Sequence, residues 1–404
     1  MALFGTIRWL KPTMRGLLGL SFGVIMAFPG AGWTQQQSTA MRSAEMPVEA
    51  ESGFLHNQGA QPRFESASKI SPEALVAVEQ QRIASVPHFS GSFDFAGTNF
   101  PFTMVGSKPQ SGRSTTIPTQ LIPVTLYFDG YVDSAGKPIV LGPEPILPQV
   151  EASPNFRNAV YLSGVTQFGD AVQRAQFYRI MSQDWHTLLG PPEVLKPVTI
   201  EVPRGSAKVY HNRSTGAVYA LVDTAFFISH LNTIVQLEDL HPDALAVVLT
   251  TNVFLTPELD VKKCCVLGFH TAFDAGEVEN THLIQTLVWA SWLDAGILSG
   301  NVADVTPLSH EISEWMNNPF DSNLVPAWQS LGSPGVCQNS LETADPVAAL
   351  PNAGYPVTID GITFHPQTQV LLPWFTRGSS DTLDGALSFP DPGLVTRTSL
   401  PCAK

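Results

Sequence analysis

Strand-like and helix-like patterns of apolar residues follow one another along the middle of this chain. Runs rich in β-branched and aromatic residues, which favour strands, occupy residues 121–128, 198–202, 218–221, 246–250, 265–273 and 285–292. Apolar residues at helical spacing occupy residues 166–189, 223–237 and 306–317. This order, followed by an irregular tail, differs from the strand–helix alternation of a doubly wound fold. We therefore predict an α+β fold in which a mixed sheet packs with two or three helices and the C-terminal part is irregular and disulfide-linked.

Residues typical of helix starts and turns predict further helices, strands and turns in the N-terminal part of the chain. Ser71 and Pro72 favour a helix start, which predicts a short helix over residues 71–85. Residues 89–150 are β-rich and predict an N-terminal subdomain. Within them, Asp129-Gly130 predicts a turn directly after the strand 121–128.

The N-terminal residues predict export. Residues 1–33 combine a basic start, an uncharged apolar run and small residues, which is typical of a signal peptide. A membrane anchor is the alternative, but the apolar run of about 13 residues is shorter than the ~20 that a spanning helix needs. Residues 34–70 are rich in Gln, Ser, Ala and Glu, which predicts a disordered tether. Residues 71–404 would then form a single domain secreted to the periplasm or the extracellular space.

Composition and charge exclude some classes of binding partner. The 404 residues are 44% hydrophobic and 14% charged, which is enough for a large core. The net charge is −13, and removal of residues 1–33, which hold three basic and no acidic residues, would change it to −16. A surface this acidic repels nucleic acid and anionic lipid. We therefore predict no nucleic-acid partner and no stable membrane insertion of the mature chain.

The four cysteines, Cys264, Cys265, Cys337 and Cys402, would meet an oxidising environment after export. Adjacent cysteines rarely bridge each other because the ring is strained. We therefore predict that Cys264 and Cys265 pair separately with Cys337 and Cys402. A Cys-ligated zinc site is the alternative, which the lack of a CxxC pair disfavours.

Residues 306–317 carry the clearest chemical pattern. A threonine cap followed by proline begins this segment and favours a helix. His310 and Glu314 are four residues apart and project from one face, and Glu311 is rotated about 100° from His310. This is the geometry of the zinc-peptidase HExxH helix with a carboxylate in place of the second histidine. In such a helix residues i and i+4 bind the metal, and the intervening Glu acts on a bound water.

A third ligand must come from elsewhere in the chain. Glu342 in the LETADP segment is the predicted one, with Asp345 as a further ligand or as a partner of a ligand. One histidine and two carboxylates would neutralise a divalent ion. Because the set is rich in oxygen, Zn²⁺ is the first choice and Mn²⁺ or Ca²⁺ the alternatives.

Plainer interpretations exist for each of these residues. An HExxE string also arises by chance, and most such strings are solvated helix faces. Here Leu308, Ile312 and Trp315 are apolar and indicate a half-buried helix. For His270, in GFHTAF, the plainer interpretation is a buried, hydrogen-bonded histidine without a functional role. Trp328 is explained as core or cleft wall, although an aromatic ring beside a polar cleft can also stack on sugars.

Four features of residues 265–346 form a recognisable set: a Cys with a Gly-aromatic-His strand, an HExxE helix ending before Pro, a downstream Trp, and a Glu-x-x-Asp turn. In this set the chain resembles a group of uncharacterised secreted bacterial proteins and is similar to the plant Exordium-like, phosphate-induced family. The chain has Asn317-Asn318 where the group often has Asp before Pro. The resemblance implies a zincin-like metallopeptidase arrangement. The residues that it places in or beside the site are His310, Glu311, Glu314, Glu342, Asp345 and His270.

Three functions follow from these patterns. The first is a secreted peptidase-like hydrolase in which His310, Glu314 and Glu342 hold one divalent ion and Glu311 takes a proton from bound water. An extended peptide substrate would pair with the strand around residues 268–271. The second is an extracellular or cell-surface protein with a structural metal, which binds polysaccharide through aromatic side chains. The third is a secreted structural protein without metal.

Overall fold

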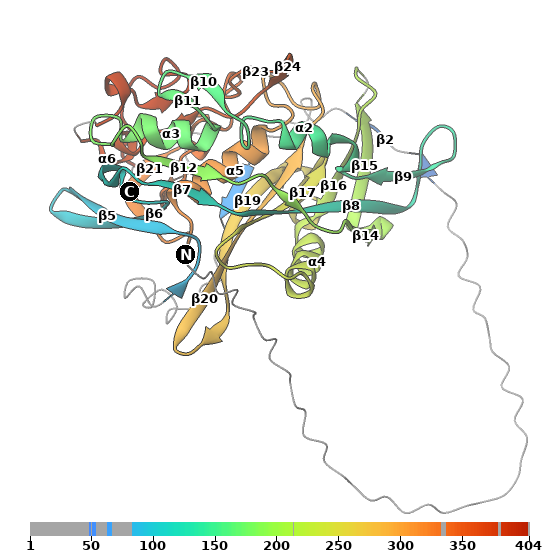
Figure 1. Cartoon of the computed structure of the whole chain (residues 1–404). Helices are drawn as coiled ribbons and strands as arrows, with labels where there is room; N and C mark the ends of the chain where they lie inside the picture. Colours follow the sequence, from blue (N-terminus) through green and yellow to red (C-terminus); the bar gives the residue numbers. More distant parts are fainter. Residues whose placement is uncertain are drawn as a thin grey trace, which may run out of the picture. The chain divides into compact units, whose positions relative to one another are not determined.

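Five neighbouring strands form the centre of a mixed sheet. Their order is β8 (Thr119–Val132), β17 (Leu245–Thr251), β20 (Thr281–Trp292), β19 (Val266–Val278) and β18 (Val253–Thr256). β8, β17 and β20 are parallel, and β19 is antiparallel to β20 (Figure 1). β17 reads LAVVLTT and is buried on both faces at six of its seven positions, as an inner strand of a parallel sheet covered on both sides should be.

The computed structural model describes residues 48–49, 51–53, 63–66, 83–212, 214–332, 337–378 and 381–402. These residues belong to one compact unit, Met46–Lys404. The signal peptide predicted for residues 1–33 lies outside the described residues, as do most of the tether predicted for 34–70 and residues 71–82 of the predicted first helix.

The sheet continues on both sides of this centre. Beyond β18 come β16 (Val218–Asp223), β15 (Ala207–Asn212) and β2 (Glu51–Gly53). Beside β8 lie β1 (Val48–Glu49), β9 (Pro138–Leu141), β13 (Glu193–Val194) and β14 (Val198–Val202). The two remaining members are β3 (Arg63–Ser66), beside β19, and β4 (Ile83–Ala84), beside β20.

Short two-stranded sheets surround the main one. They pair β5 (His88–Phe95) with β6 (Thr98–Val105), β7 (Ser114–Ile117) with β12 (His186–Leu189), β10 (Ala159–Tyr161) with β11 (Gly164–Thr166), β21 (Leu324–Gln329) with β22 (Cys337–Ser340), β23 (Val357–Ile359) with β24 (Ile362–Phe364), and β25 (Gln369–Val370) with β26 (Ser388–Phe389). The irregular, disulfide-linked C-terminal part that the sequence predicts is therefore confirmed.

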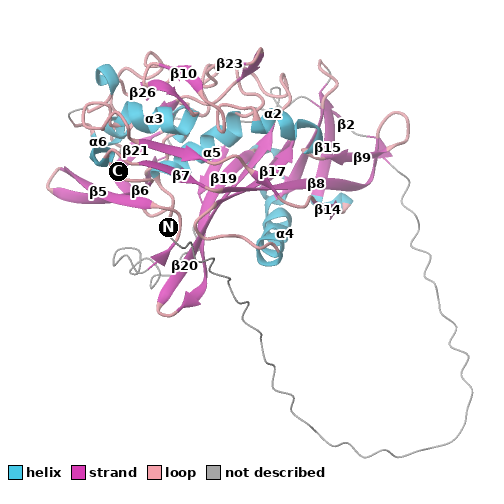
Figure 2. Ribbon diagram, viewed as in Figure 1, coloured by secondary structure: helices cyan, strands magenta, loops and turns pink. Residues whose placement is uncertain are grey.

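The helices are α2 (Leu147–Glu151), α3 (Phe168–Gln176), α4 (Thr224–Leu237), α5 (Thr306–Asn317) and α6 (Leu372–Thr376). Two of them, α5 and α4, cover the two faces of the main sheet. On one face, Leu308 of α5 shares a core with Val247 of β17. On the other face, Phe227 of α4 shares a core with the next residue of the same strand, Val248. Figure 2 shows α5 and α3 on one side of the strands and α4 on the other. The predicted α+β class is therefore confirmed.

Long-range pairing overrides the helix predicted over residues 166–189. α3 ends at Gln176, and residues 186–189 form β12, which pairs with β7. The buried carboxylate of Asp170 in α3 accepts a hydrogen bond from the backbone N–H of Thr187 (2.6 Å) and lies 2.8 Å from His186 Nδ1. Asp170 thus connects β12 to α3. The helix predicted for the second half of residues 166–189 is therefore wrong.

Three N-terminal predictions also differ from the structure. β8 runs through Asp129-Gly130, where its pairing with β9 shifts register, and the turn comes after Asp133 instead. Because β8 belongs to the main sheet, residues 89–150 do not form a subdomain of their own. Residues 83–84 are strand β4 rather than the end of a helix.

Parts of the predicted tether are ordered strands. β1 pairs with β8, β2 with β15 and β3 with β19, each in parallel. Backbone groups at open strand edges pair with any chain that supplies partners in register. At these residues the tether prediction is therefore wrong.

The disulfide pairing differs from the prediction. Cys264 bonds to Cys265, and Cys337 bonds to Cys402, with Cα atoms 5.9 Å apart in the second pair. Cys337 begins β22, which pairs with β21, and Pro401 at the chain end bridges Trp328 of the same β21. The chain end is therefore brought to Cys337, whereas the adjacent cysteines lie in another core cluster at the start of β19. Among the described residues, no helix combines the length and apolarity that a membrane span requires.

Candidate metal centre

α5 carries one histidine and two glutamates although every residue of Thr306–Asn317 is buried. Thr306 is the first helical residue rather than the cap, and it anchors the first turn. Its hydroxyl accepts from the backbone N–H of Ala303 (3.0 Å) and donates to the carbonyl of His365 (2.6 Å). Tertiary contacts thus hold α5 against β19 and β20.

The pair predicted from the HExxE motif comes together on this helix. His310 Nε2 lies 3.1 Å from Glu314 Oε2 and 3.6 Å from Asp345 Oδ1. The backbone N–H groups of Ala344 and Asp345 donate to Glu314 Oε1 at 3.0 and 3.1 Å. These bonds fix the carboxylate and leave its other oxygen beside the histidine. His310, Glu314 and Asp345 therefore form one compact set of ligand atoms.

Gln367 orients His310. The amide oxygen of Gln367 lies 3.0 Å from His310 Nδ1, and its amide nitrogen donates to the carbonyl of Ala344 (2.7 Å). Since the amide nitrogen is engaged, the amide oxygen accepts the Nδ1 proton, and the lone pair of the neutral ring then lies on Nε2. A partner on the far nitrogen of this kind is usual for metal-binding histidines. Sequence reasoning missed Gln367 because no motif marks a single glutamine 57 residues downstream.

His270 of β19 forms a second group next to the first. Its Nδ1 lies 3.4 Å from Glu311 Oε2 and 3.8 Å from Glu314 Oε2. On the other side of the ring, Nε2 lies 3.7 Å from Glu342 Oε2. Asp321, which follows α5, completes this side. Glu342 thus faces His270, and no sequence pattern indicated Asp321.

Trp328 packs against the segment that carries Glu342 and donates a hydrogen bond to it. The Glu342 carboxylate accepts from Ser340 Oγ (2.7 Å) and Asn318 Nδ2 (3.3 Å). Trp328 is fully buried, packs edge-on against Trp374, and its Nε1 donates to the carbonyl of Ser340 (2.9 Å). Trp328 is therefore core and not part of a sugar-stacking surface.

The ligand atoms fall into three overlapping sets, each with its members within 4.8 Å of one another. These sets are His310, Glu314 and Asp345; His270, Glu311 and Glu314; and His270, Asp321 and Glu342. Of the residues predicted to bind the metal, His310 and Glu314 share a set, and Glu342 lies on the far side of His270. Asp345 and His270, predicted as neighbours of the ligands, both join the cluster.

Burial sets the electrostatics of the cluster. It raises the pKa of Glu311 and of Glu342 well above the usual range, and the charge of Glu314 adds to the effect. Burial acts in the same direction on Glu314, but His310, His270 and the backbone N–H of Ala344 together outweigh it and lower the pKa of Glu314. Burial lowers the pKa of His310, but Glu314, Asp345 and Gln367 together outweigh it and raise this pKa. For His270, burial prevails and lowers the pKa. Without a cation, Glu311 and Glu342 therefore keep their protons at pH values where an exposed glutamate is charged.

Some polar atoms of the cluster remain unsatisfied. Among the described residues, Glu311 Oε1 and Glu342 Oε2 are buried and have no hydrogen-bond partner. The described ion pairs of Glu311, Glu314 and Glu342 involve histidines alone. Leaving such atoms unpaired costs about 1–3 kcal/mol each, and more for charged groups. These buried His and Glu groups could hold a divalent metal ion.

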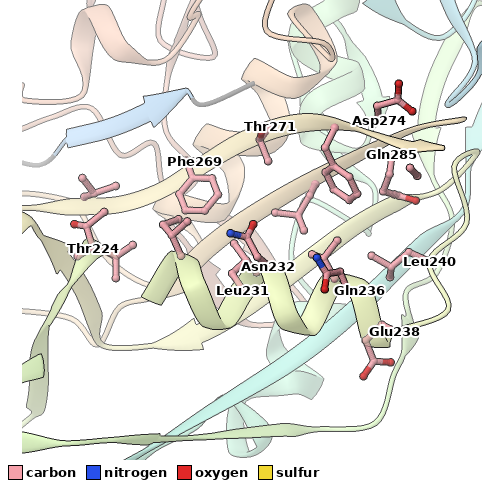
Figure 3. Close-up of a pocket in the computed structure, with 17 residues that line it drawn as sticks. Thr224, Leu231, Asn232, Gln236, Glu238, Leu240, Phe269, Thr271, Asp274 and Gln285 are labelled. Atoms are coloured by element: carbon pink, nitrogen blue, oxygen red, sulfur yellow. The ribbon is translucent and has the colours of Figure 1, made fainter. Parts of the chain in front are cut away.

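A cavity of about 860 Å³ lies on the opposite face of the sheet, between α4 and β19 (Figure 3). Its walls include Leu231 of α4 and Phe269 and Thr271 of β19. Side chains alternate along a strand, so Gly268 and His270 face α5 instead. A Cβ on Gly268 would lie 2.7 Å from Glu311 Cγ. This cavity therefore does not open onto the metal-ligand cluster.

Compared with known proteins, the chain matches no family model, no curated protein and no solved structure. The resemblance to secreted HExxE proteins thus rests on the motif residues alone.

Proposed function

We propose that this chain is an exported metal-dependent hydrolase of the peptidase-like class. The observation that carries the proposal is the buried His–Glu cluster on and beside α5, in which the ligand atoms of His310, Glu314 and Asp345 all lie within 4.8 Å of one another. The position of the HExxE helix is consistent with it: α5 packs against β19 and β20 of the mixed sheet. The two disulfides suit an oxidising compartment.

His310, Glu314 and Asp345 would hold the ion, and Glu342, on the far side of His270, would lie outside this ligand set. The set is rich in oxygen, so Zn²⁺ is the first candidate, and Mn²⁺ and Ca²⁺ remain alternatives. A bound divalent ion supplies polarisation of the attacked carbonyl and a lower pKa of water.

Glu311 would act as the general base. Burial raises the pKa of its carboxyl, which moves it toward the range in which a base both accepts and releases protons near neutral pH. His270 Nδ1, 3.4 Å away, can donate to Glu311 and so orient it. Both side chains lie between β19 and α5, and an attacked carbonyl would have to enter this space.

One observation favours a second candidate function. His310 and Glu311 have no exposed surface, and Glu314 and Glu342 are 2% exposed, so no substrate reaches the cluster in this conformation. A structural metal in an extracellular binding protein fits such complete burial. The buried Trp328 gives no support to polysaccharide stacking.

The test compares metal content and turnover in three proteins spanning residues 34–404. We expect about one equivalent of metal in the parent, none in the His310→Ala/Glu314→Ala double variant, and unchanged content in a His282→Ala/Asp274→Ala control. The control removes a similar His–carboxylate pair, 3.1 Å apart, away from the cluster. Metal-free parent protein would rule out the proposal.

A Glu311→Gln variant then separates the two functions. For a hydrolase, hydrolysis of fluorescein-labelled casein should fall at least ~100-fold while the metal stays bound, because only the base is lost. Metal retained in both proteins without any hydrolysis in the parent would favour the structural role.

A further inference from the structure

We propose that the outer edge of β19 at Val266–His270 is a peptide-binding edge, and that the chain's own N-terminal strand β3 occupies it. The catalytic meaning of this edge rests on the proposed hydrolase function. The binding itself does not, because it depends on backbone pairing alone.

The edge is defined by where its neighbours stop. One side of β19 pairs with β20 over most of its length. On the other side, β18 reaches only Val266, through its pair with Leu255. From Val266 onward β3 takes the position, pairing Arg63 with Val266, Phe64 with Gly268 and Ser66 with His270. Without β3, the backbone N–H and C=O groups of this stretch would face outward unpaired, which is a template for an added strand.

The same stretch borders the proposed catalytic residues. Gly268 lies directly against the Glu311 side chain, since a Cβ there would come within 2.7 Å of Glu311 Cγ. His270, at the end of the paired run, lies 3.4 Å from Glu311. An extended polypeptide on this edge would therefore run past the general base, so the substrate class that fits is an extended peptide. β3 then keeps this position filled.

β3 differs from the other two N-terminal strands in its position within the sheet. β1 and β2 pair at the two ends of the sheet order, on β8 and β15. β3 instead pairs in the interior of the order, beside β19, which among the described strands is the one that supplies a residue to the cluster. It is also only four residues long, shorter than the average strand of 5–6 residues. A short strand held by backbone bonds is one that another peptide can replace.

Proline scanning of β3 tests the proposal in the protein spanning residues 34–404. Consecutive amides of a strand point in opposite directions, so one of Phe64→Pro and Glu65→Pro must remove an N–H that faces β19. Phe64→Ala and Glu65→Ala keep every backbone amide and are the matched controls. The probe is a fluorescein-labelled peptide of residues 61–69, QPRFESASK.

We expect at least one proline variant to bind this peptide at least ~10-fold more tightly than the parent by fluorescence anisotropy. The same variant should show at least ~10-fold faster amide hydrogen exchange in fragments covering residues 266–271. Both alanine controls should behave like the parent. Proline variants that match the alanine controls in both measurements would overturn the proposal, and so would faster exchange without peptide binding.

Two further readouts keep this proposal separate from the hydrolase proposal. Circular dichroism and metal content of the proline variants verify that the fold and the centre are intact. Peptide binding without casein hydrolysis would confirm the edge and count against the hydrolase. If the parent hydrolyses casein but no proline variant changes in peptide binding or in hydrogen exchange, the result would support the hydrolase and count against the peptide-binding edge.

Discussion

Glu311 is the residue whose ionisation should be most visible in stability. It is fully buried and faces Glu314, Asp345, Glu342 and His270, and burial raises its pKa well above 4.5. In metal-free protein, the unfolded chain ionises this group at a lower pH than the folded chain. The stability that the neutral carboxyl provides is therefore complete below pH 4.5 and is lost as the pH rises toward the folded-state pKa.

Glu311→Gln removes this titration and keeps the size of the side chain. With chelator present, we expect the parent to lose stability relative to the variant as the pH rises from 4.5, by at most about 1.4 kcal/mol per pH unit. Urea unfolding between pH 4.5 and 7.5 measures the difference. Adding Zn²⁺ should reduce it, because a cation favours the charged carboxylate. Parallel stability curves for the two metal-free proteins would contradict this assignment.

At the scale of elements, the contact between β19 and α5 depends on a missing side chain. A Cβ at Gly268 would lie 2.7 Å from Glu311 Cγ and 3.0 Å from the carbonyl oxygen of Trp289. Gly268→Ala should therefore push α5 from the strand and destabilise the protein by about 1–3 kcal/mol. It should also weaken metal binding, because His310 moves with the helix.

Gly205→Ala is the matched control, because a Cβ there meets no atom within 4 Å. Its effect on the free energy of unfolding should stay within about 0.5 kcal/mol. Thermal unfolding of both variants and zinc titration of each provide the comparison. A Gly268→Ala protein as stable as the Gly205→Ala protein would show that the helix adapts to the added methyl group.

The same elements show what the sequence could predict. α4, α5 and β14 lie where their periodicities indicate, because a local signal marks each segment: the Asp223 cap for α4, Pro307 in the first turn for α5 and the β-branched run for β14. Residues 186–189 were predicted as helix, but pairing with β7 decided their structure. In the site, the HExxE spacing brings His310 and Glu314 together. The contributions of Asp321 and Gln367 depend on tertiary contacts that no local pattern records.

At the scale of the whole chain, both terminal regions are tied to the body of the protein. The N-terminal strands β1, β2 and β3 pair with β8, β15 and β19. The C-terminal region is closed by the Cys337–Cys402 disulfide, whose partners are 65 residues apart. The residues between them include Glu342, Asp345 and Gln367, so this loop carries a large share of the cluster. Closing it restricts the unfolded chain and keeps these residues near α5.

Removing this disulfide should therefore affect stability and metal binding together. For a loop of 65 residues, the chain-entropy model gives about 4 kcal/mol of stabilisation. We expect the Cys337→Ser/Cys402→Ser variant to unfold with a free energy lower by up to about that amount, and to bind Zn²⁺ more weakly. Because reductant opens the same loop in the parent, the difference between parent and variant should vanish in dithiothreitol. A variant as stable as the oxidised parent would mean that β21, β22 and Trp328 hold the loop without the bond.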